Sequence, residues 1–277
     1  MNNKPIMLGA VAYDAKVIPI WDIIRDYFND NGVRLDYVLF SNYEAQVDAL
    51  LSGKVDIAWN TNVAWCRIVQ ATQNKAKALV MRDTDIGFKS IFISKASKNI
   101  RSIDDLKGKK FGLGSQDSAQ AAIFPYHALQ QEGLNIKEDL ELVRFNSDLG
   151  KHGDTGKSEF DILEAILNDE IDAGAIGSTT WIRMIEEGLF PDGEIVSFYS
   201  TEPYCHCNFT VLPDANEEMC EIFSKTLLEQ DPSDPIIKKM MIMEGLNKWV
   251  KVGEEELQGY ETLFEAMKNQ DLLENKI

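Results

Sequence analysis

The chain has 277 residues, which is enough for one large domain or two modest ones. Hydrophobic residues make up 44% of it, so a real core can form, and the formal net charge is −17. Such a field repels nucleic-acid phosphates and anionic lipid, and no stretch approaches the ~20 apolar residues of a membrane span. We therefore expect neither nucleic-acid binding nor direct membrane insertion.

Short apolar runs alternate with longer amphipathic stretches along the first third of the chain. This rhythm predicts parallel strands with helices packed on both faces of a sheet. The predicted strands are Met7–Ala12, Leu35–Phe40, Val55–Trp59, Ala76–Met81 and Lys89–Ser94. The predicted helices are Val17–Phe28, Tyr43–Leu51 and one that begins at Val63.

The rhythm then restarts. Capping-box signatures predict helix starts at Ser102 with Asp105 and at Ser158 with Asp161. The later predicted strands are Lys110–Leu113, Leu140–Phe145, Ala173–Ile176, Ile195–Tyr199 and Cys207–Leu212. The later predicted helices are Ser118–Glu132, Ser158–Asn168, Ser178–Glu187, Glu217–Glu229, Pro235–Gly245 and Glu254–Asn269.

One segment of the chain echoes another at a constant offset of 116 residues. Residues 49–58 (ALLSGKVDIA) and 165–174 (AILNDEIDAG) both read as a helix, a tight turn, an aspartate and a short buried strand. A repeated unit of this kind predicts two lobes of similar construction, each with its own sheet. We expect residues 1–90 with 208–277 to form lobe I and residues 91–207 to form lobe II.

Three predicted strand-to-helix turns, at residues 60–62, 114–118 and 178–180, are rich in hydroxyl and amide side chains. Ligands of open α/β sheets bind beyond the carboxyl ends of strands, where helix N-termini present unpaired N–H groups and a positive dipole end. Ordinary N-capping explains any one of these turns equally well. Three such turns at matching places favour a shared binding site, with Asp117 acting either as a structural cap or as a ligand contact.

The segment Lys107–Ser115, together with Val55–Trp59 and Ile171–Ala175, resembles the phosphonate/phosphite-type substrate-binding proteins of ABC transporters. The similarity covers roughly residues 6–267. It implies the α/β, two-lobed type 2 periplasmic-binding-protein fold, with a mostly parallel sheet flanked by helices in each lobe. It also implies hinge closure through two crossover strands, 89–94 and 207–212, on a small anionic or zwitterionic ligand of the phosphonate or phosphate-ester class.

The candidate ligand-binding residues come from two sources. The resemblance implies Ser115, Ser118, Asn60 and Thr61, with Tyr13 or Tyr43 contributing from the first lobe. The turns, one glycine-bounded loop and the crossover segment add Asn62, Asp117, His152, Thr155, Ser178, Thr179, Trp181 and His206. Trp181 is included because an indole at a helix start can stack on a planar ligand.

Cys205-His206-Cys207 is the most unusual local feature of the sequence. A thiol, an imidazole and a second thiol can join a soft-metal site, but no second cysteine pair completes a zinc pattern. We therefore expect buried, reduced cysteines in a strand, with Cys205 and Cys207 on one face, and we expect no cofactor. The metal interpretation stays open as an alternative.

The alternative function is a cytosolic enzyme on the same fold, of the cofactor- or metabolite-biosynthesis type. Its catalytic candidates are His152, Asp154, His206 and Cys207. A third class, a cytosolic sensor, has no distinctive mark in the sequence. No apolar signal region precedes the first strand, so the sequence as written predicts a cytoplasmic protein, or an extracytoplasmic one if a signal has been removed. We expect a monomer that binds a small molecule and, if exported, an ABC transporter permease.

Overall fold

The computed structural model describes residues 4–274, which form two compact units. The first unit contains the chain up to residue 87, residues 205–264 and the chain from residue 271; the second contains residues 88–204 and 265–270. The chain thus passes between units at Gly87–Phe88 and at Tyr204–Cys205, and twice more near its C-terminus, after residues 264 and 270. The predicted lobe boundaries at residues 90 and 207 and the predicted hinge motion stay predictions. The connections at Gly87–Phe88 and Tyr204–Cys205 lie just before residues 89–94 and 207–212, the strands that were predicted to form the hinge.

The first unit is built on a five-stranded sheet of order β2-β1-β3-β11-β4. Strand β1 (Ile6–Val11) pairs in parallel with β2 (Leu35–Phe40) and β3 (Ile57–Asn60). Strand β11 (Asn208–Val211) is antiparallel to β3 and to β4 (Lys77–Ala78). Four of these five strands therefore run in one direction.

The second unit repeats this arrangement in the order β8-β7-β9-β6-β10. Strand β7 (Lys109–Leu113) pairs in parallel with β8 (Leu140–Arg144) and β9 (Ala173–Gly177). Strand β6 (Ser90–Lys95) is antiparallel to β9 and to β10 (Ile195–Ser200). The two sheets share one strand pattern, which confirms the similar, mostly parallel sheets that the sequence echo predicts.

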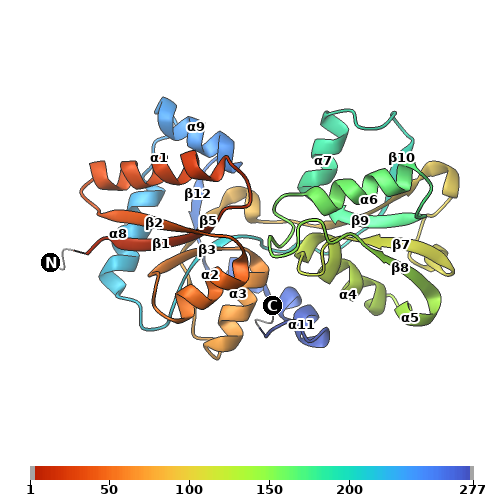
Figure 1. The fold of residues 1–277 in the computed structure, drawn as a ribbon, viewed down its shortest axis with the longest axis horizontal. Helices are drawn as coiled ribbons and strands as arrows, with labels where there is room; N and C mark the ends of the chain where they lie inside the picture. Colours follow the sequence, from red (N-terminus) through yellow and green to blue (C-terminus); the bar gives the residue numbers. More distant parts are fainter. Residues whose placement is uncertain (1–3, 275–277) are drawn as a thin grey trace. The chain divides into compact units, whose positions relative to one another are not determined.

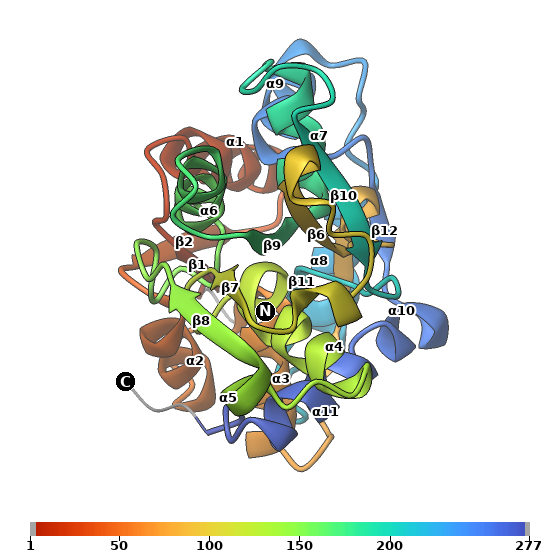
Figure 2. The ribbon, with the colours of Figure 1, turned by 90° about the vertical axis from the view of Figure 1, so that its right-hand side faces the viewer.

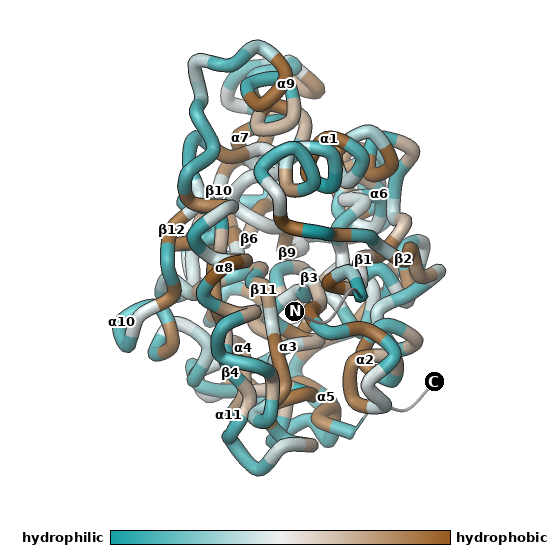
Figure 3. The backbone as a smooth tube through the Cα atoms, turned by 90° about the vertical axis from the view of Figure 1, so that its left-hand side faces the viewer, coloured by the Kyte–Doolittle hydropathy of each residue, from teal (hydrophilic) through white to brown (hydrophobic). Residues whose placement is uncertain are grey.

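Helices cover both faces of the first sheet (Figure 1). Helices α1 (Val17–Asp30), α8 (Glu217–Leu228) and α9 (Pro235–Glu244) share one core with β1, β3 and β11, in which Phe28, Phe209 and Phe223 are fully buried. Helices α2 (Tyr43–Leu51) and α3 (Asn62–Ala71) close the other face around Val47 and Ile68. Hydrophobic and hydrophilic residues alternate along α1 and α8 (Figure 3), as expected for helices with one buried side.

The second sheet is covered in the same way (Figure 2). Helices α4 (Phe124–Gln131) and α5 (Ile136–Asp139) pack on a core that contains Phe92 and Phe111. Helices α6 (Lys157–Leu167) and α7 (Ser178–Glu186) pack on the opposite core with Ile162 and Met184. None of the helices in residues 4–274 has the length and hydropathy of a membrane span.

Several predicted elements divide in the structure. The strand expected at 76–81 becomes β4 and β5 (Val80–Arg82), and β5 pairs with β12 (Trp249–Lys251), which the sequence did not indicate. The helix expected at 118–132 begins as a π-helical turn, η4 (Ala119–Ile123), before α4. The helix expected at 254–269 becomes α10 (Glu254–Gln258) and α11 (Glu261–Asn269).

The predicted capping box at Ser158 is wrong, and the one at Ser102 is formed only in part. Helix α6 begins one residue earlier than expected, with left-handed Gly156 as its N-cap, and Asp161 forms an ion pair with Lys157. The Ser102 amide and hydroxyl both donate to Asp105, but only a 3₁₀ turn, η3 (Asp104–Leu106), follows. Asp161 therefore has a different partner from the expected one, whereas Asp105 keeps Ser102 as its partner but no α-helix follows.

Candidate functional site

The carboxyl ends of β1, β2 and β3 lie on one edge of the first sheet, because these three strands are parallel. Tyr13 follows β1, the N-cap Asn42 precedes Tyr43 after β2, and residues 60–62 lead from the last residue of β3 into α3. The fold therefore brings the candidates of the first unit together at the carboxyl edge of its sheet. This is the edge at which open α/β sheets bind ligands.

Asn60 is the candidate of this edge whose side chain is least satisfied by the protein. Its Oδ1 accepts a hydrogen bond from Gln46 Nε2 at 2.7 Å, and the same Nε2 donates to the Trp59 carbonyl at 2.8 Å. The Asn60 side chain is 0% exposed, and its Nδ2 has no partner among residues 4–274. A buried donor without a partner costs about 1–3 kcal/mol, so it is a natural contact for a ligand oxygen.

The other candidates of this edge have structural partners. Thr61 caps α3 by accepting from the Ala64 amide at 3.3 Å, and Asn62 Nδ2 donates to the Cys205 carbonyl at 3.1 Å. The Tyr43 ring is buried in the core beneath α2, whereas Tyr13 is half-buried with the Lys16 ammonium 5.7 Å from its ring centre. As ligand contacts, these four residues stay predictions.

The carboxyl ends of β7 and β9 form the corresponding edge in the second unit. Ser115 and Ser118 follow β7, and Ser118 caps η4 by accepting from the Ala121 amide at 3.2 Å. The Ser115 hydroxyl is hydrogen-bonded to the Asp148 carboxylate, which also accepts from Thr155 Oγ1 at 3.1 Å. Ser115 and Thr155 therefore hold the loop 148–156 in place, which is a structural role that the sequence did not reveal.

This loop folds closely over the turn after β7. Asp117 accepts from the Gly150 amide at 2.6 Å, so it anchors the loop, consistent with a structural role for its carboxylate. His152 is 1% exposed with a φ of +52°, and Gly153 follows with a φ of +85°. A Cβ at Gly153 would lie 2.4 Å from Ser118 Oγ and 2.5 Å from Gln120 Nε2. The loop backbone thus lies directly against polar side chains at the start of η4.

The side chains of the third turn, residues 178–180, and of Trp181 are less closely grouped than the sequence predicts. Ser178 Oγ accepts from the Lys89 amide at 3.2 Å, and Thr179 is exposed. Trp181 stacks on Phe190, with ring centres 5.6 Å apart and an angle of 16° between the planes. The indole is thus packed within its own unit, and its role as a ligand contact stays a prediction.

Sequence reasoning missed Glu159, which connects the turns of the second unit. This carboxylate is 1% exposed, accepts from the Gly177 amide at 2.6 Å and from Gln120 Nε2 at 3.2 Å. Burial raises the pKa of Glu159 to about 7, even though hydrogen bonds from Gly177, Thr180 and Gln120 favour the ionised form. A glutamate three residues after Gly156 resembles an ordinary first-turn residue, so its burial has no signal in the sequence.

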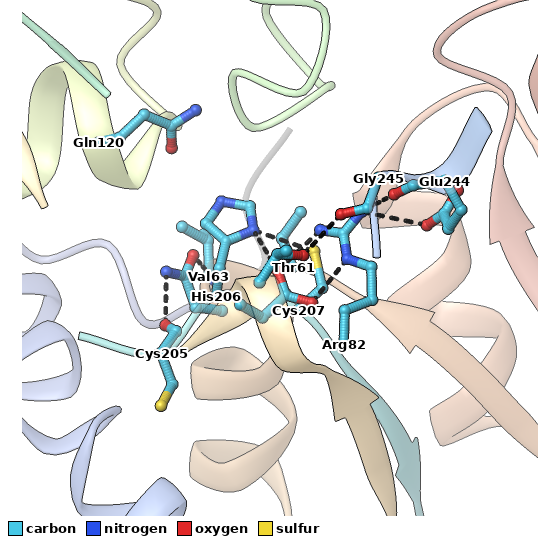
Figure 4. Close-up of polar contacts among 12 residues, drawn as sticks. Thr61, Val63, Arg82, Gln120, Cys205, His206, Cys207, Glu244 and Gly245 are labelled. Carbon is cyan, nitrogen blue, oxygen red and sulfur yellow. Dashed lines mark hydrogen bonds and ion pairs between the residues drawn. The ribbon is translucent and has the colours of Figure 1, made fainter. Parts of the chain in front are cut away.

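His206 and Cys207 lie in contact in the first unit, with 3.0 Å between His206 Nδ1 and Cys207 Sγ (Figure 4). Cys205 is placed differently: its amide donates to the Gly259 carbonyl, and its sulfur packs against that glycine. Burial raises the pKa of the Cys205 thiol to about 12. None of the four cysteines, all of which lie within residues 4–274, forms a disulfide.

Comparison with known proteins identifies the family. Residues 11–256 match the model of the family described as "ABC transporter, phosphonate, periplasmic substrate-binding protein". The chain is a member of this family. Membership supports the solute-binding interpretation over the enzyme alternative, and it places the protein in an ABC transporter context.

Individual relatives of this phosphonate-binding family member are distant but cover most of the chain. A probable ABC transporter phosphite-binding protein, PhnD1 of Prochlorococcus marinus, is 24% identical over 280 residues, covering 95% of this chain and 89% of its own. The phosphate-import protein PhnD of Mycolicibacterium smegmatis is 23% identical over 234 residues, covering 80% of this chain and 70% of its own.

Solved structures show the same fold. PhnD1 of P. marinus in complex with methylphosphonate has a TM-score of 0.74 at 19% identity, covering 98% of this chain and 100% of its own. XAC2383 of Xanthomonas citri bound to ATP has a TM-score of 0.76 at 17% identity, covering 97% and 99%. The expected two-lobed periplasmic-binding-protein architecture is thereby confirmed.

Proposed function

We propose that this family member binds a small phosphorus oxyanion of the phosphonate and phosphite class and is the solute-binding component of an ABC transporter. The observation that carries the proposal is the family match over residues 11–256. The relative PhnD1, solved with methylphosphonate, supports this class of ligand. The ligand is bound and released chemically unchanged.

The chemistry of the two carboxyl edges suits an oxyanion. Each edge presents helix N-termini, whose amides and dipoles attract anions without any basic side chain. The first edge adds the buried Asn60 amide, and the second adds the hydroxyl-rich turn at Ser118. A protein with a net charge of −17 needs such local attraction, since its overall field repels anions.

The physiological setting forms part of the same proposal. The family description supports a position outside the cytoplasmic membrane and delivery of the ligand to a permease. We further propose that the protein acts as a monomer, with His152, Thr155 and His206 among its ligand contacts. His152 and His206 are both buried, so either imidazole can offer a hydrogen bond away from competing water.

The direct test is calorimetric titration with methylphosphonate, phosphite, phosphate and methanesulfonate, followed by mass spectrometry of the recovered ligand. We expect saturable 1:1 binding of at least one phosphorus oxyanion and recovery of an unaltered compound. Chemical turnover would instead support the enzyme alternative, with His152, Asp154, His206 and Cys207 as its candidates. Absence of binding by all four compounds would refute the proposed ligand class.

A matched pair of variants tests the location of binding. Asn60→Asp keeps the shape of the side chain but replaces the Nδ2 donor with a charged oxygen, so we expect at least a tenfold loss of oxyanion affinity. Asn99→Asp adds the same charge after β6, which is antiparallel to β9 and therefore ends at the opposite edge of the second sheet. Equal affinities for the two variants would exclude Asn60 from the site.

A further inference from the structure

Three buried side chains of types that can ligate a metal ion meet in the first unit. Asp85, His206 and Cys207 each offer one donor atom, and these atoms lie within 4.8 Å of one another. His206 Nδ1 is 3.0 Å from Cys207 Sγ and 3.7 Å from Asp85 Oδ1. The exposed fractions of the three residues are 0%, 4% and 3%. This group is called the Asp-His-Cys cluster below.

The backbone holds the Asp-His-Cys cluster together from two distant parts of the chain. The His206 amide donates to the Asp85 carbonyl at 2.9 Å, and β11 begins one residue after Cys207 and pairs with β3. Asp85 is two residues before the Gly87–Phe88 connection, and His206 is two residues after Tyr204. The donors are therefore positioned by main-chain pairing, which is the preorganisation that a metal site requires.

We propose that the Asp-His-Cys cluster is a binding site for a single divalent zinc ion. Zinc accepts carboxylate, imidazole and thiolate ligands at about 2.0–2.3 Å in tetrahedral geometry, which separates the donor atoms by roughly 3.3–3.6 Å. The two separations from His206 Nδ1, 3.0 Å to Cys207 Sγ and 3.7 Å to Asp85 Oδ1, bracket this range, and the third lies within 4.8 Å. Three protein ligands leave a fourth position for a water molecule.

The residues around the cluster complete the electrostatics of such a site. Arg82 donates to both oxygens of Asp85 at 2.7 Å, and also to Glu244 Oε1 at 3.2 Å and to the Glu244 carbonyl at 2.8 Å (Figure 4). A carboxylate accepts about four hydrogen bonds, so Asp85 keeps lone pairs for a metal while Arg82 fixes its orientation. With zinc bound, the charges of Asp85, Glu244 and the Cys207 thiolate balance those of Arg82 and the ion.

The donor set differs from the one that the sequence indicated. The metal alternative left open by the sequence grouped Cys205 with His206 and Cys207, but Cys205 packs against Gly259, and the third residue of the cluster is Asp85. A mixed nitrogen, oxygen and sulfur set favours zinc over magnesium or calcium, which prefer oxygen ligands alone. His206 is also among the proposed solute contacts, so the cluster is tested with the metal alone, in the absence of solute.

The experiment uses the full chain, purified without chelator and titrated with zinc and then with cobalt as a spectroscopic probe. We expect one equivalent of zinc by elemental analysis and, with cobalt, a thiolate-to-metal charge-transfer band. Cys207→Ser should abolish the band, His206→Gln should weaken binding at least tenfold, and Cys220→Ser, a thiol on α8, should change neither. Loss of all metal on desalting, or a band that persists in Cys207→Ser, would overturn the proposal.

A measurement on the unaltered protein guards against a variant that does not fold. The zinc X-ray absorption spectrum should show one sulfur neighbour at about 2.3 Å with nitrogen or oxygen neighbours at about 2.0–2.1 Å. A spectrum without sulfur would place the ion on surface carboxylates and reject the site. Solute binding by zinc-free wild type, measured in parallel, separates this result from the proposed function: oxyanion binding without zinc binding refutes the zinc site alone, and zinc binding without oxyanion binding refutes the proposed function alone.

Discussion

Asp172 and Lys110 exchange two hydrogen bonds between neighbouring segments of the second sheet. The Lys110 amide donates to the Asp172 carboxylate at 3.0 Å, and the Asp172 amide donates to the Lys110 carbonyl at 2.9 Å. Asp56 and Met7 make the same pair of bonds in the first sheet, each at 2.8 Å. The 116-residue echo therefore marks the same two hydrogen bonds at the start of the parallel strand pair β1–β3 in one sheet and β7–β9 in the other.

These two aspartates are expected to stabilise their units similarly. Asp56→Ala and Asp172→Ala each remove a charged acceptor from a backbone amide, so each should lower the free energy of unfolding by about 1.5–3 kcal/mol. Urea unfolding followed by circular dichroism measures the change. Asp192→Ala, at an exposed position after Pro191, is the control and should change stability by less than about 0.5 kcal/mol. Equal effects at all three positions would contradict the structural role of the echo.

Gly153→Ala tests the close approach of the loop 148–156 to the turn after β7. The added Cβ meets Ser118 Oγ at 2.4 Å and Gln120 Nε2 at 2.5 Å, in addition to the cost of a φ of +85°. We expect a loss of stability above about 2 kcal/mol and at least a tenfold loss of oxyanion affinity.

Gly193→Ala is the matched control for this substitution. Gly193 has a φ of +75°, and a Cβ there meets nothing within 4 Å. It carries the conformational cost of about 1–2 kcal/mol without the collision, so affinity should be unchanged. Equal effects of Gly153→Ala and Gly193→Ala on stability and on binding would contradict the close packing of the loop 148–156 against Ser118 and Gln120.

Glu159 should make stability depend on pH. Its pKa is raised from 4.5 to about 7 by burial, so the stability contributed by its neutral form is fully present below pH 4.5 and is lost as the pH rises through 7. Asp148 and Tyr204 are the titratable groups that interact with it. Glu159→Gln keeps an acceptor for the Gly177 amide. It should remove the loss of roughly 3 kcal/mol in the free energy of unfolding that wild type suffers as the pH rises.

The measurement is urea unfolding of wild type and Glu159→Gln at pH 5 and pH 8. The stability of wild type relative to the variant should fall between these pH values. Glu164→Gln, at an exposed position of the same helix, should track wild type at both. A difference between wild type and Glu159→Gln that is constant with pH would contradict the buried, neutral state of this side chain.

Glu44 and Arg67 form a buried ion pair between α2 and α3, with 2.9 Å between Oε1 and Nη1. Glu44→Ala leaves the guanidinium buried without this carboxylate and should cost about 3–5 kcal/mol, whereas Glu44→Leu combined with Arg67→Met should recover most of it. Glu187→Ala, which breaks the exposed pair with Arg183, should cost less than about 1 kcal/mol. Thermal unfolding of wild type and these variants, together with Glu44→Leu alone and Arg67→Met alone, distinguishes these outcomes. Losses of the two single variants that add up in the double variant would argue against coupling.

The sequence was most informative where apolar residues recur with the period of a strand or of a helix. Leu35–Phe40 and Tyr43–Leu51 were predicted with their observed bounds, because a partly buried strand and an amphipathic helix leave clear periods. The short edge strand β12 was missed, since three residues carry no period. The divided helix at 254–269 has continuous helical composition, and its break near Gly259 is imposed by packing of that glycine against Cys205.

The candidate site was only partly visible in the sequence. The strand-end turns were found because their composition is local, and Ser118 and Thr61 are indeed helix caps. The partners of Ser115 and His206 were not found, because Asp148 and Asp85 reach them only through the fold. Glu159 is buried because the starts of η4, α6 and α7 lie around it, and the spacing of residues along the sequence does not indicate that these three starts meet.

Calorimetric titration of methylphosphonate and phosphite into wild type, Asn60→Asp and Asn99→Asp is the most direct test of oxyanion binding at the carboxyl edge of the first sheet. We expect wild type and Asn99→Asp to bind one equivalent with the same affinity, and Asn60→Asp to bind at least tenfold more weakly. Three folded proteins that bind neither compound, or that bind them equally well, would contradict binding at this edge.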